Sequence, residues 1–139
     1  MTTAGAEPET LPGGAIQHAA EQMQWQAGPA ALPPGTQLMV LEGDPKGAGL
    51  FTLRLKVPAG TRLPPHTHPR DERVTVLSGR VGVGFGERFD DKALRFFDAG
   101  SYYLNPAELP HFVLFPIESV VQITGIGPWQ MRPVATAKP

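Results

Sequence analysis

The chain has 139 residues, 41% of them hydrophobic, with a formal net charge of -1. This length provides one domain with one core, and 16 Gly and 16 Pro disfavour long helices. The absence of Cys excludes disulfides and thiolate metal sites, and the scattered Lys and Arg argue against a nucleic-acid partner. Because neither a long apolar run nor a secretion signal is visible, we expect no membrane partner and a cytoplasmic location.

Residues 1–35 are predicted to form an N-terminal extension or arm. Residues 28–35 have the Pro- and Gly-rich composition of a linker, and residues 15–26 are expected to form a short helix or an irregular arm. Trp25 is expected to pack against the domain; the alternative is an edge strand given to a neighbouring subunit. His18 is expected to be an ordinary exposed histidine.

From Thr36 onward the sequence alternates apolar and polar residues with a period of two. This pattern predicts strands over residues 37–42, 51–57, 74–78, 81–85, 101–105, 111–115 and 120–126. Ser78-Gly79 indicates a hairpin, and residues 87–99 are a longer excursion with room for one helical turn. Seven or so short strands predict an all-β sandwich, jelly roll or small barrel over residues 36–132. Residues 133–139 are predicted to be a flexible tail.

Glycine alternates with apolar residues in one of these strands. Gly82 and Gly84 lie between Val81, Val83 and Phe85. Glycine along one face of a strand leaves room for another backbone or for a bulky side chain.

Three of the four histidines lie in two short segments. His66 and His68 are two residues apart, so their imidazoles share one side of an extended chain, and the flanking prolines favour that conformation. Glu72 follows after a short turn and can reach the same point. His111 begins a predicted strand whose alternation directs it inward. Burying so many polar groups without a common partner would cost several kcal/mol, and a metal ion satisfies all of them.

The first segment is similar to the first cupin motif, G-x5-H-x-H-x3-E-x6-G, at each fixed position from Gly60 to Gly79. The second cupin motif, G-x5-P-x-G-x2-H-x3-N, is matched at Gly100, Pro106 and His111. Glu108 replaces the Gly of that motif and Phe115 replaces its Asn. Residues 125–129 (GIGPW) also resemble a set of small bacterial cupins.

The resemblance implies a single-domain jelly-roll β-barrel that binds one divalent transition metal ion, Fe, Mn, Ni, Zn or Cu. The implied ligands are His66, His68, Glu72 and His111. The resemblance also implies a homodimer, to which the N-terminal arm would contribute. Replacing Gly by Glu108 raises the question of the turn conformation, because Gly adopts positive φ at little cost.

Four protein ligands on a six-coordinate ion leave two positions open, which favours chemistry or ligand capture over a purely structural ion. No catalytic residue beyond the metal ligands is identified. The cavity is expected to be lined mainly by Phe, Val and Leu. The candidate lining residues are Tyr102 and Tyr103, one of which should face the cavity, together with Val113, Phe115 and Gln122. We expect a metal-dependent enzyme, dioxygenase-like, acting on a small organic molecule. The alternatives are a non-catalytic ligand-binding or sensor protein and a sugar or sugar-acid isomerase.

Overall fold

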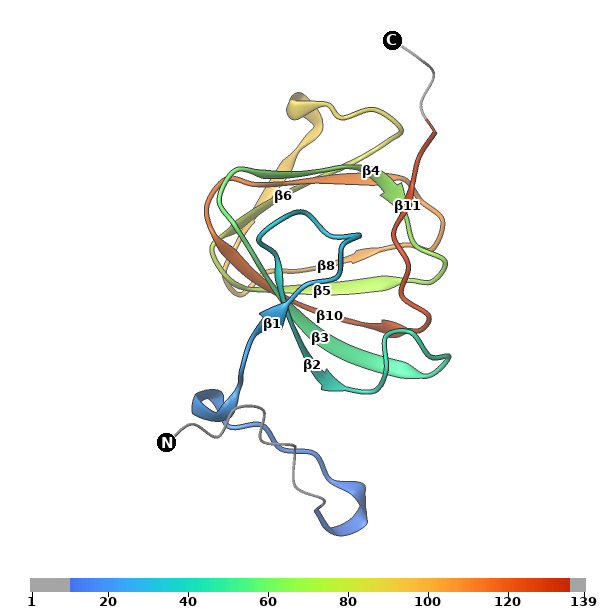
Figure 1. Cartoon of the computed structure of the whole chain (residues 1–139). Coiled ribbons are helices and arrows are strands. Elements are labelled where there is room, and N and C mark those ends of the chain that lie inside the picture. Colours follow the sequence, from blue (N-terminus) through green and yellow to red (C-terminus); the bar gives the residue numbers. More distant parts are fainter. Residues whose placement is uncertain (1–10, 136–139) are drawn as a thin grey trace.

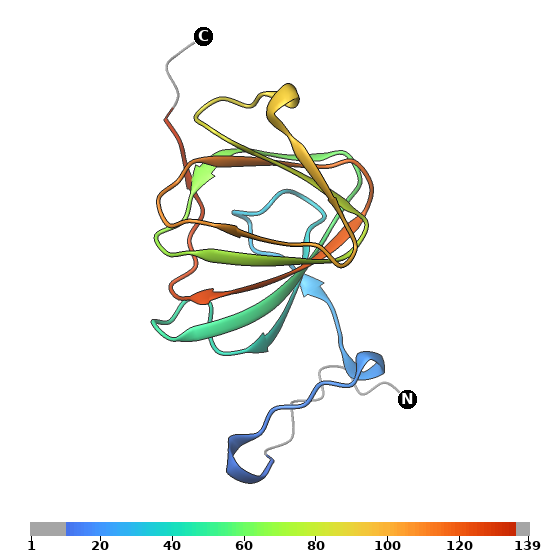
Figure 2. The same ribbon diagram turned by 180° about the vertical axis from the view of Figure 1, so that it is seen from behind.

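The computed structural model describes residues 11–135 as two antiparallel β-sheets that face each other (Figures 1 and 2). The six-stranded sheet has the order β1 (Gln26–Ala27), β2 (Gln37–Glu42), β3 (Leu50–Val57), β10 (Ser119–Ile126), β5 (Glu72–Ser78), β8 (Tyr102–Asn105). The five-stranded sheet has the order β11 (Arg132–Pro133), β4 (Thr61–Thr67), β9 (His111–Phe115), β6 (Arg80–Phe85), β7 (Arg95–Asp98). The chain passes repeatedly between the two sheets, as in a jelly roll, so the predicted all-β fold is confirmed.

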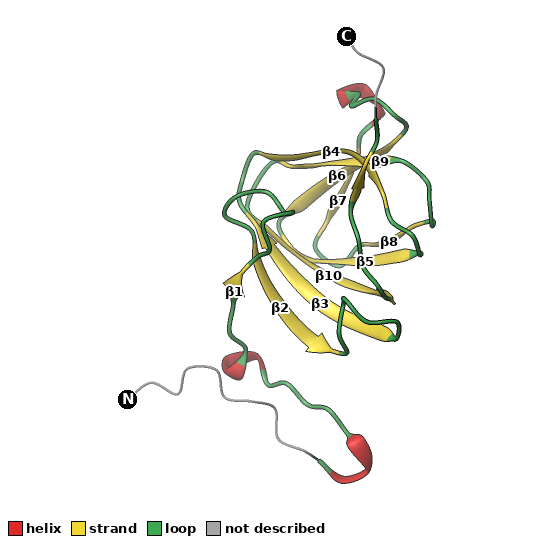
Figure 3. Cartoon of the chain, turned by 45° about the vertical axis from the view of Figure 1, so that its right-hand side comes forward, coloured by secondary structure: helices red, strands yellow, loops and turns green. Residues whose placement is uncertain are grey.

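Helical structure among the described residues is limited to three short 3₁₀ turns, drawn in red in Figure 3. They are η1 (Pro12–Gly14), η2 (Ala20–Gln22) and η3 (Asp91–Ala93). The last provides the helical turn expected in residues 87–99, and β7, which follows it, was not predicted. In the part of the chain that the structure describes, there is no helix whose length and apolar character would let it cross a lipid bilayer.

The core lies between the sheets and follows the period of two seen in the sequence. In β3, Phe51, Leu53, Leu55 and Val57 are buried, whereas the residues between them are half-buried. The same alternation in β5 and β10, together with Val113 and Phe115 of β9, directs apolar side chains of both sheets toward one another. Burying one such side chain contributes about 1.5–3 kcal/mol.

The predicted Ser78-Gly79 hairpin is wrong. Strand β5 pairs with β10 and β8, and β6 pairs with β9 and β7, so the chain crosses from one sheet to the other at this point. The buried Ser119 hydroxyl accepts from the Arg80 N–H and contacts the Arg80 carbonyl oxygen, which fixes the crossing. A turn dipeptide between two strands fits such a crossing as well as it fits a hairpin.

The glycine face of β6 receives aromatic rings, as the sequence predicted. A Cβ atom on Gly84 would lie 2.3 Å from Phe112 Cε2, and one on Gly82 would lie 2.6 Å from Phe96 Cε1. Phe112 is buried and packs against Phe89, with 4.8 Å between ring centroids. The outer surface of this sheet therefore has its own small aromatic cluster.

The N-terminal segment projects beyond the barrel (Figures 1 and 2) and contacts it at a few points. Strand β1 pairs with β2 of the same chain, Trp25 is half-buried with Lys56 Nζ 5.1 Å from its ring centroid, and His18 is half-buried, its Nε2 lying 2.6 Å from the Leu41 carbonyl oxygen. Residues 1–10 and 136–139 lie outside the described residues, so the outer parts of the predicted arm and tail stay predictions.

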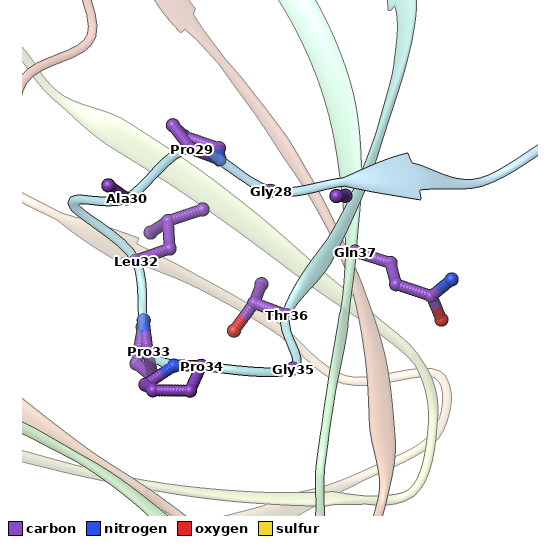
Figure 4. A pocket seen from close by; sticks show the side chains of 10 residues that line it. Gly28, Pro29, Ala30, Leu32, Pro33, Pro34, Gly35, Thr36 and Gln37 are labelled. Atoms are coloured by element: carbon purple, nitrogen blue, oxygen red, sulfur yellow. The ribbon is translucent and has the colours of Figure 1, made fainter.

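The segment predicted as a linker forms a closed loop between β1 and β2, shown from close by in Figure 4. Its ends are joined by a hydrogen bond from the Gly28 N–H to the Thr36 carbonyl oxygen. Leu32, in the middle of the loop, is buried as part of the hydrophobic core. The loop borders a surface pocket of about 410 Å³ lined only by residues 27–37.

Candidate metal centre

Three histidines meet at one end of the barrel. His66 lies in β4 directly opposite His111 of β9, after an irregularity in the pairing between Leu63 and His66. His68 follows the end of β4. The three ring centroids are 4.3, 5.0 and 5.1 Å apart, and all three residues are buried, with 4% or less of their surface exposed.

Each imidazole is oriented through its Nδ1 atom, which lies within hydrogen-bond distance of a backbone carbonyl oxygen. The distances are 2.7 Å from His66 to Pro64, 2.8 Å from His68 to Gln130 and 3.1 Å from His111 to Leu109. A carbonyl oxygen only accepts, so each Nδ1 donates a proton and each neutral ring keeps its lone pair on Nε2. Metal-binding histidines are oriented in this way by their surroundings.

The Nε2 atoms of His68 and His111 are buried and have no hydrogen-bond partner. One nitrogen from each of the three histidines lies within 4.8 Å of the others. Buried polar atoms without a partner cost free energy, and a cation among the three rings removes that cost. His66, His68 and His111 can therefore hold a metal ion.

Glu72, the fourth predicted ligand, is buried beside the histidines at the start of β5. Its Oε2 lies 3.2 Å from His68 Nε2, and its Oε1 lies 3.7 Å from His111 Nε2. When both Nε2 atoms carry lone pairs, they face the carboxylate oxygens and the contacts are repulsive. A proton or a metal cation between them makes the contacts attractive. The structure thus brings all four predicted residues together.

Two residues that the sequence did not identify hold the Glu72 carboxylate. The Asn105 amide donates from Nδ2 to Glu72 Oε1 at 2.8 Å, and the Trp129 indole donates from Nε1 to Oε2 at 3.0 Å. Trp129 also stacks on the His68 ring, with centroids 6.2 Å apart and planes 13° apart. Both donors leave the carboxylate ionised and fixed in direction.

The electrostatics of the site favour a cation. Burial, reinforced by nearby His111, lowers the pKa of His66 from 6.5 to about 4. Burial also acts to lower the pKa of His68, but contact with Glu72 outweighs it and raises that pKa. Burial would raise the pKa of Glu72, but His111 and His68 bring it well below its ordinary value of 4.5. The raised pKa of His68 and the lowered pKa of Glu72 both favour a positive charge beside an ionised carboxylate.

The residues predicted to line the cavity divide into three groups. Tyr103 faces inward, where burial and then the charge of Glu72 raise its pKa, while its neighbour Tyr102 is 58% exposed on the opposite face. Val113 and Phe115 are buried in the hydrophobic core. The prediction for Gln122 is wrong: it lies between the buried Val121 and Ile123, and its side chain accepts a hydrogen bond from Arg54 on the outer face.

One of the two departures from the second cupin motif, Glu108, lies in the turn before His111. Glu108 has a positive φ of 64°, a conformation that Gly adopts at little cost. Its N–H donates to the His68 carbonyl oxygen at 2.8 Å, so the turn directly contacts a candidate ligand. For a residue with a Cβ atom this conformation costs about 1–2 kcal/mol.

The space beside the site is small. A recess of about 10 Å³ lies among His68, Trp129, Phe51, Ile126 and the turn before β5, which is room for about one water molecule. The pocket of about 410 Å³ lies by the loop before β2, and the first residues of β2 pair with the end of β3. Glu72, in contrast, pairs with Gly125, which lies opposite the start of β3. These two places are at opposite ends of the strands, so the larger pocket is separate from the histidines.

Comparison with known proteins places the chain among cupins. A family model described as the ChrR cupin-like domain matches residues 14–130. Germin-like protein 3-1 of Oryza sativa subsp. japonica is 34% identical over 86 residues, which are 61% of this chain and 34% of the relative. The chain thus spans about a third of the length of that relative.

Solved structures show the same fold. An acetylacetone dioxygenase from Acinetobacter johnsonii has a TM-score of 0.66 at 19% identity, with 91% of this chain and 82% of that chain covered. A putative acetylacetone dioxygenase from Methylibium petroleiphilum has a TM-score of 0.67 at 20% identity, covering 100% and 91%. The polyketide cyclase RemF from Streptomyces resistomycificus has a TM-score of 0.67 at 16% identity, covering 89% and 88%. At these identities the likeness establishes the fold alone.

Proposed function

The chain belongs to the ChrR cupin-like domain family, and from that membership we propose that it is a metal-dependent enzyme of the oxygenase type acting on a small organic molecule. One observation carries the proposal. Three buried imidazoles have their Nδ1 atoms fixed by carbonyl oxygens and present Nε2 lone pairs to one another beside an ionised carboxylate.

His66, His68, His111 and Glu72 would hold the ion. Imidazole and carboxylate ligands without thiolate suit Fe, Mn, Ni, Zn or Cu in the divalent state. When bound, such an ion would supply a Lewis acid with open coordination positions for a chelating substrate. The buried Phe51 and the indole of Trp129 border the recess beside His68.

The named activities of the structural relatives suggest where to look for substrate. Two of them are described as an acetylacetone dioxygenase and a putative one, and acetylacetone carries two oxygens that chelate a metal. The barrel interior of this chain is mainly apolar, which suits a compact, weakly polar substrate with one chelating oxygen pair. We therefore place β-diketones first among the compounds to test.

The test is oxygen consumption by protein purified without a His tag and loaded with Fe(II) under anaerobic conditions. We expect uptake of O2 with a β-diketone, a phenol or a thiol, its loss in His111→Ala and its retention in His18→Ala, whose side chain lies outside the site. Fe(II)-loaded protein that consumes no O2 with any of these compounds would contradict the oxygenase proposal while leaving metal binding intact.

A second candidate function is a non-catalytic ligand-binding or sensor protein. The observation that favours it is the recess of only about 10 Å³ beside His68, which is far below the usual 300–1,000 Å³ of small-molecule pockets. A ligand that raises the melting temperature of the metal-loaded protein without being converted would support this function, and product formation would exclude it. A sugar isomerase is less well supported, because the core around the site is formed largely by Val, Leu and Phe.

A further inference from the structure

The residues after β10 contact two of the four candidate ligands. The Gln130 carbonyl oxygen accepts from His68 Nδ1 at 2.8 Å, and the Trp129 indole N–H donates to Glu72 Oε2 at 3.0 Å. The indole also stacks on His68. One short stretch of chain thus fixes one histidine and one carboxylate, although it supplies no ligand itself.

This stretch is firmly anchored to another loop. The Trp129 N–H donates to the Pro45 carbonyl oxygen at 2.6 Å, and the Gly127 N–H donates to that of Gly49 at 2.8 Å. A Cβ atom on Gly127 would lie 2.0 Å from the Gly47 carbonyl oxygen, so the two loops touch where only glycine fits. The backbone position of Trp129, from which the indole extends, is therefore fixed.

We propose that Trp129 is a positioning residue for the metal centre: its indole N–H directs the Glu72 carboxylate toward the ion, and its ring reports whether the ion is bound. A carboxylate without fixed donors can rotate, whereas Glu72 has one donor on each oxygen, Asn105 and Trp129. Each oxygen keeps a second lone pair for a cation. This inference rests on metal binding by the site, which the proposed function shares, and not on turnover.

The decisive experiment is a double-mutant cycle read by Co(II) affinity. Trp129→Phe removes the N–H and keeps an aromatic ring over His68, and Glu72→Ala removes the group on which the N–H acts. We expect Trp129→Phe to weaken Co(II) binding roughly 10- to 100-fold, as outer residues of metal sites do, and to have no effect in the Glu72→Ala background. Trp25→Phe, which changes the other tryptophan, should bind Co(II) like the unchanged protein.

Two results would overturn the inference. An affinity of Trp129→Phe within about twofold of the unchanged protein would mean that the indole does not position the ligand. An equal loss with and without Glu72 would mean that Trp129 acts only by supporting the fold. Because no arm measures O2 uptake, an inactive protein that behaves as expected would contradict the oxygenase proposal and leave this inference standing.

A second measurement avoids the risk that Trp129→Phe does not fold. In the Trp25→Phe protein, Trp129 is the sole tryptophan, so its indole ¹⁵N–¹H resonance is assigned without further work. We expect this resonance to shift on addition of Zn(II) and to stay in place in Trp25→Phe/His111→Ala. An indole resonance that does not move at saturating Zn(II) would overturn the proposal.

Discussion

His66 makes the stability of the metal-free protein depend on pH. Burial lowers the pKa of its imidazole from 6.5 to about 4, whereas the unfolded chain keeps the ordinary value of about 6.5. Below that pH the unfolded state binds a proton that the folded state does not bind, so the free energy of unfolding falls as pH falls. At about 1.4 kcal/mol per pH unit, the loss approaches about 3 kcal/mol as the pH nears 4.

The two neighbouring groups His68 and Glu72 do not explain a loss of stability over the upper part of this pH range. The pKa of His68 is raised above 6.5, so His68 is protonated in both the folded and unfolded states once the pH is below 6.5. The pKa of Glu72 lies well below 4.5, so this residue stays ionised in the folded protein, and its own contribution to stability is lost only as pH falls through and below about 4.5. Between about pH 6.5 and 5, His66 therefore lowers the free energy of unfolding as the pH falls.

The assay is urea unfolding in the presence of a chelator at several pH values across that range. The unchanged protein should lose about 2 kcal/mol between pH 6.5 and 5, and His66→Asn, which cannot titrate, should lose much less. His18→Asn is the matched control and should keep the full slope, because His18 lies outside the site. Equal slopes for the unchanged protein and His66→Asn would refute the reasoning.

Four further predictions concern the metal and the packing of β6. His111→Ala should lose most of the affinity for Zn(II) by isothermal titration calorimetry; unchanged affinity would mean a ligand set of three. Zn(II) at about 100 times its Kd should stabilise the unchanged protein by about 2.7 kcal/mol, and differential scanning calorimetry that finds no rise in Tm would argue against a preformed site. Gly84→Ala should destabilise the fold by about 1–3 kcal/mol in urea, because its Cβ would lie 2.3 Å from the buried ring of Phe112. Gly82→Ala should cost less, because the ring of Phe96 that it meets is 38% exposed and can turn away; equal costs would contradict this explanation.

Much of the barrel was predictable because burial follows a period of two. Strands β2 and β9 have the predicted bounds, and β3, β5, β6, β8 and β10 differ from theirs by one or two residues. The pairing of these strands was harder to predict. Alternation within β5 and β6 is the same whether they pair or lie in opposite sheets, so the sequence predicts a hairpin at Ser78-Gly79 where the structure has a crossing. Strand β7 was missed because Phe96 and Phe97 are adjacent and break the alternation.

His66, His68 and Glu72 were predictable because their spacing is local and prolines hold the chain extended around them, and His111 because it matches the second motif and begins a strand whose alternation directs it inward. Asn105 and Trp129 were missed because they match no fixed position of either motif and lie 33 and 57 residues from Glu72. A signal did exist for Asn105, which shares the inward parity of Tyr103 on β8. The inward prediction for Gln122 conflicts with the same alternation, because Val121 and Ile123 on either side of it form the buried face of β10.

Leu32 shows the limit of composition as a guide. Its segment is rich in Pro and Gly, which are typical of linkers, yet the loop is closed by a hydrogen bond and Leu32 is part of the core. Nothing in the local sequence distinguishes a loop that packs against a barrel from one that leaves it. That distinction depends on the hydrophobic core against which Leu32 packs, which only the assembled fold provides.

The four candidate ligands do not all belong to one sheet. His66, His68 and His111 come from or adjoin β4 and β9, whereas Glu72 begins β5 in the opposite sheet. An ion held by all four would cross-link the two sheets, which the backbone joins only through its connecting turns. Loading would then slow the separation of the sheets, and amide hydrogen exchange in β5 and β9 would record occupancy of the site even in a protein that turns over nothing.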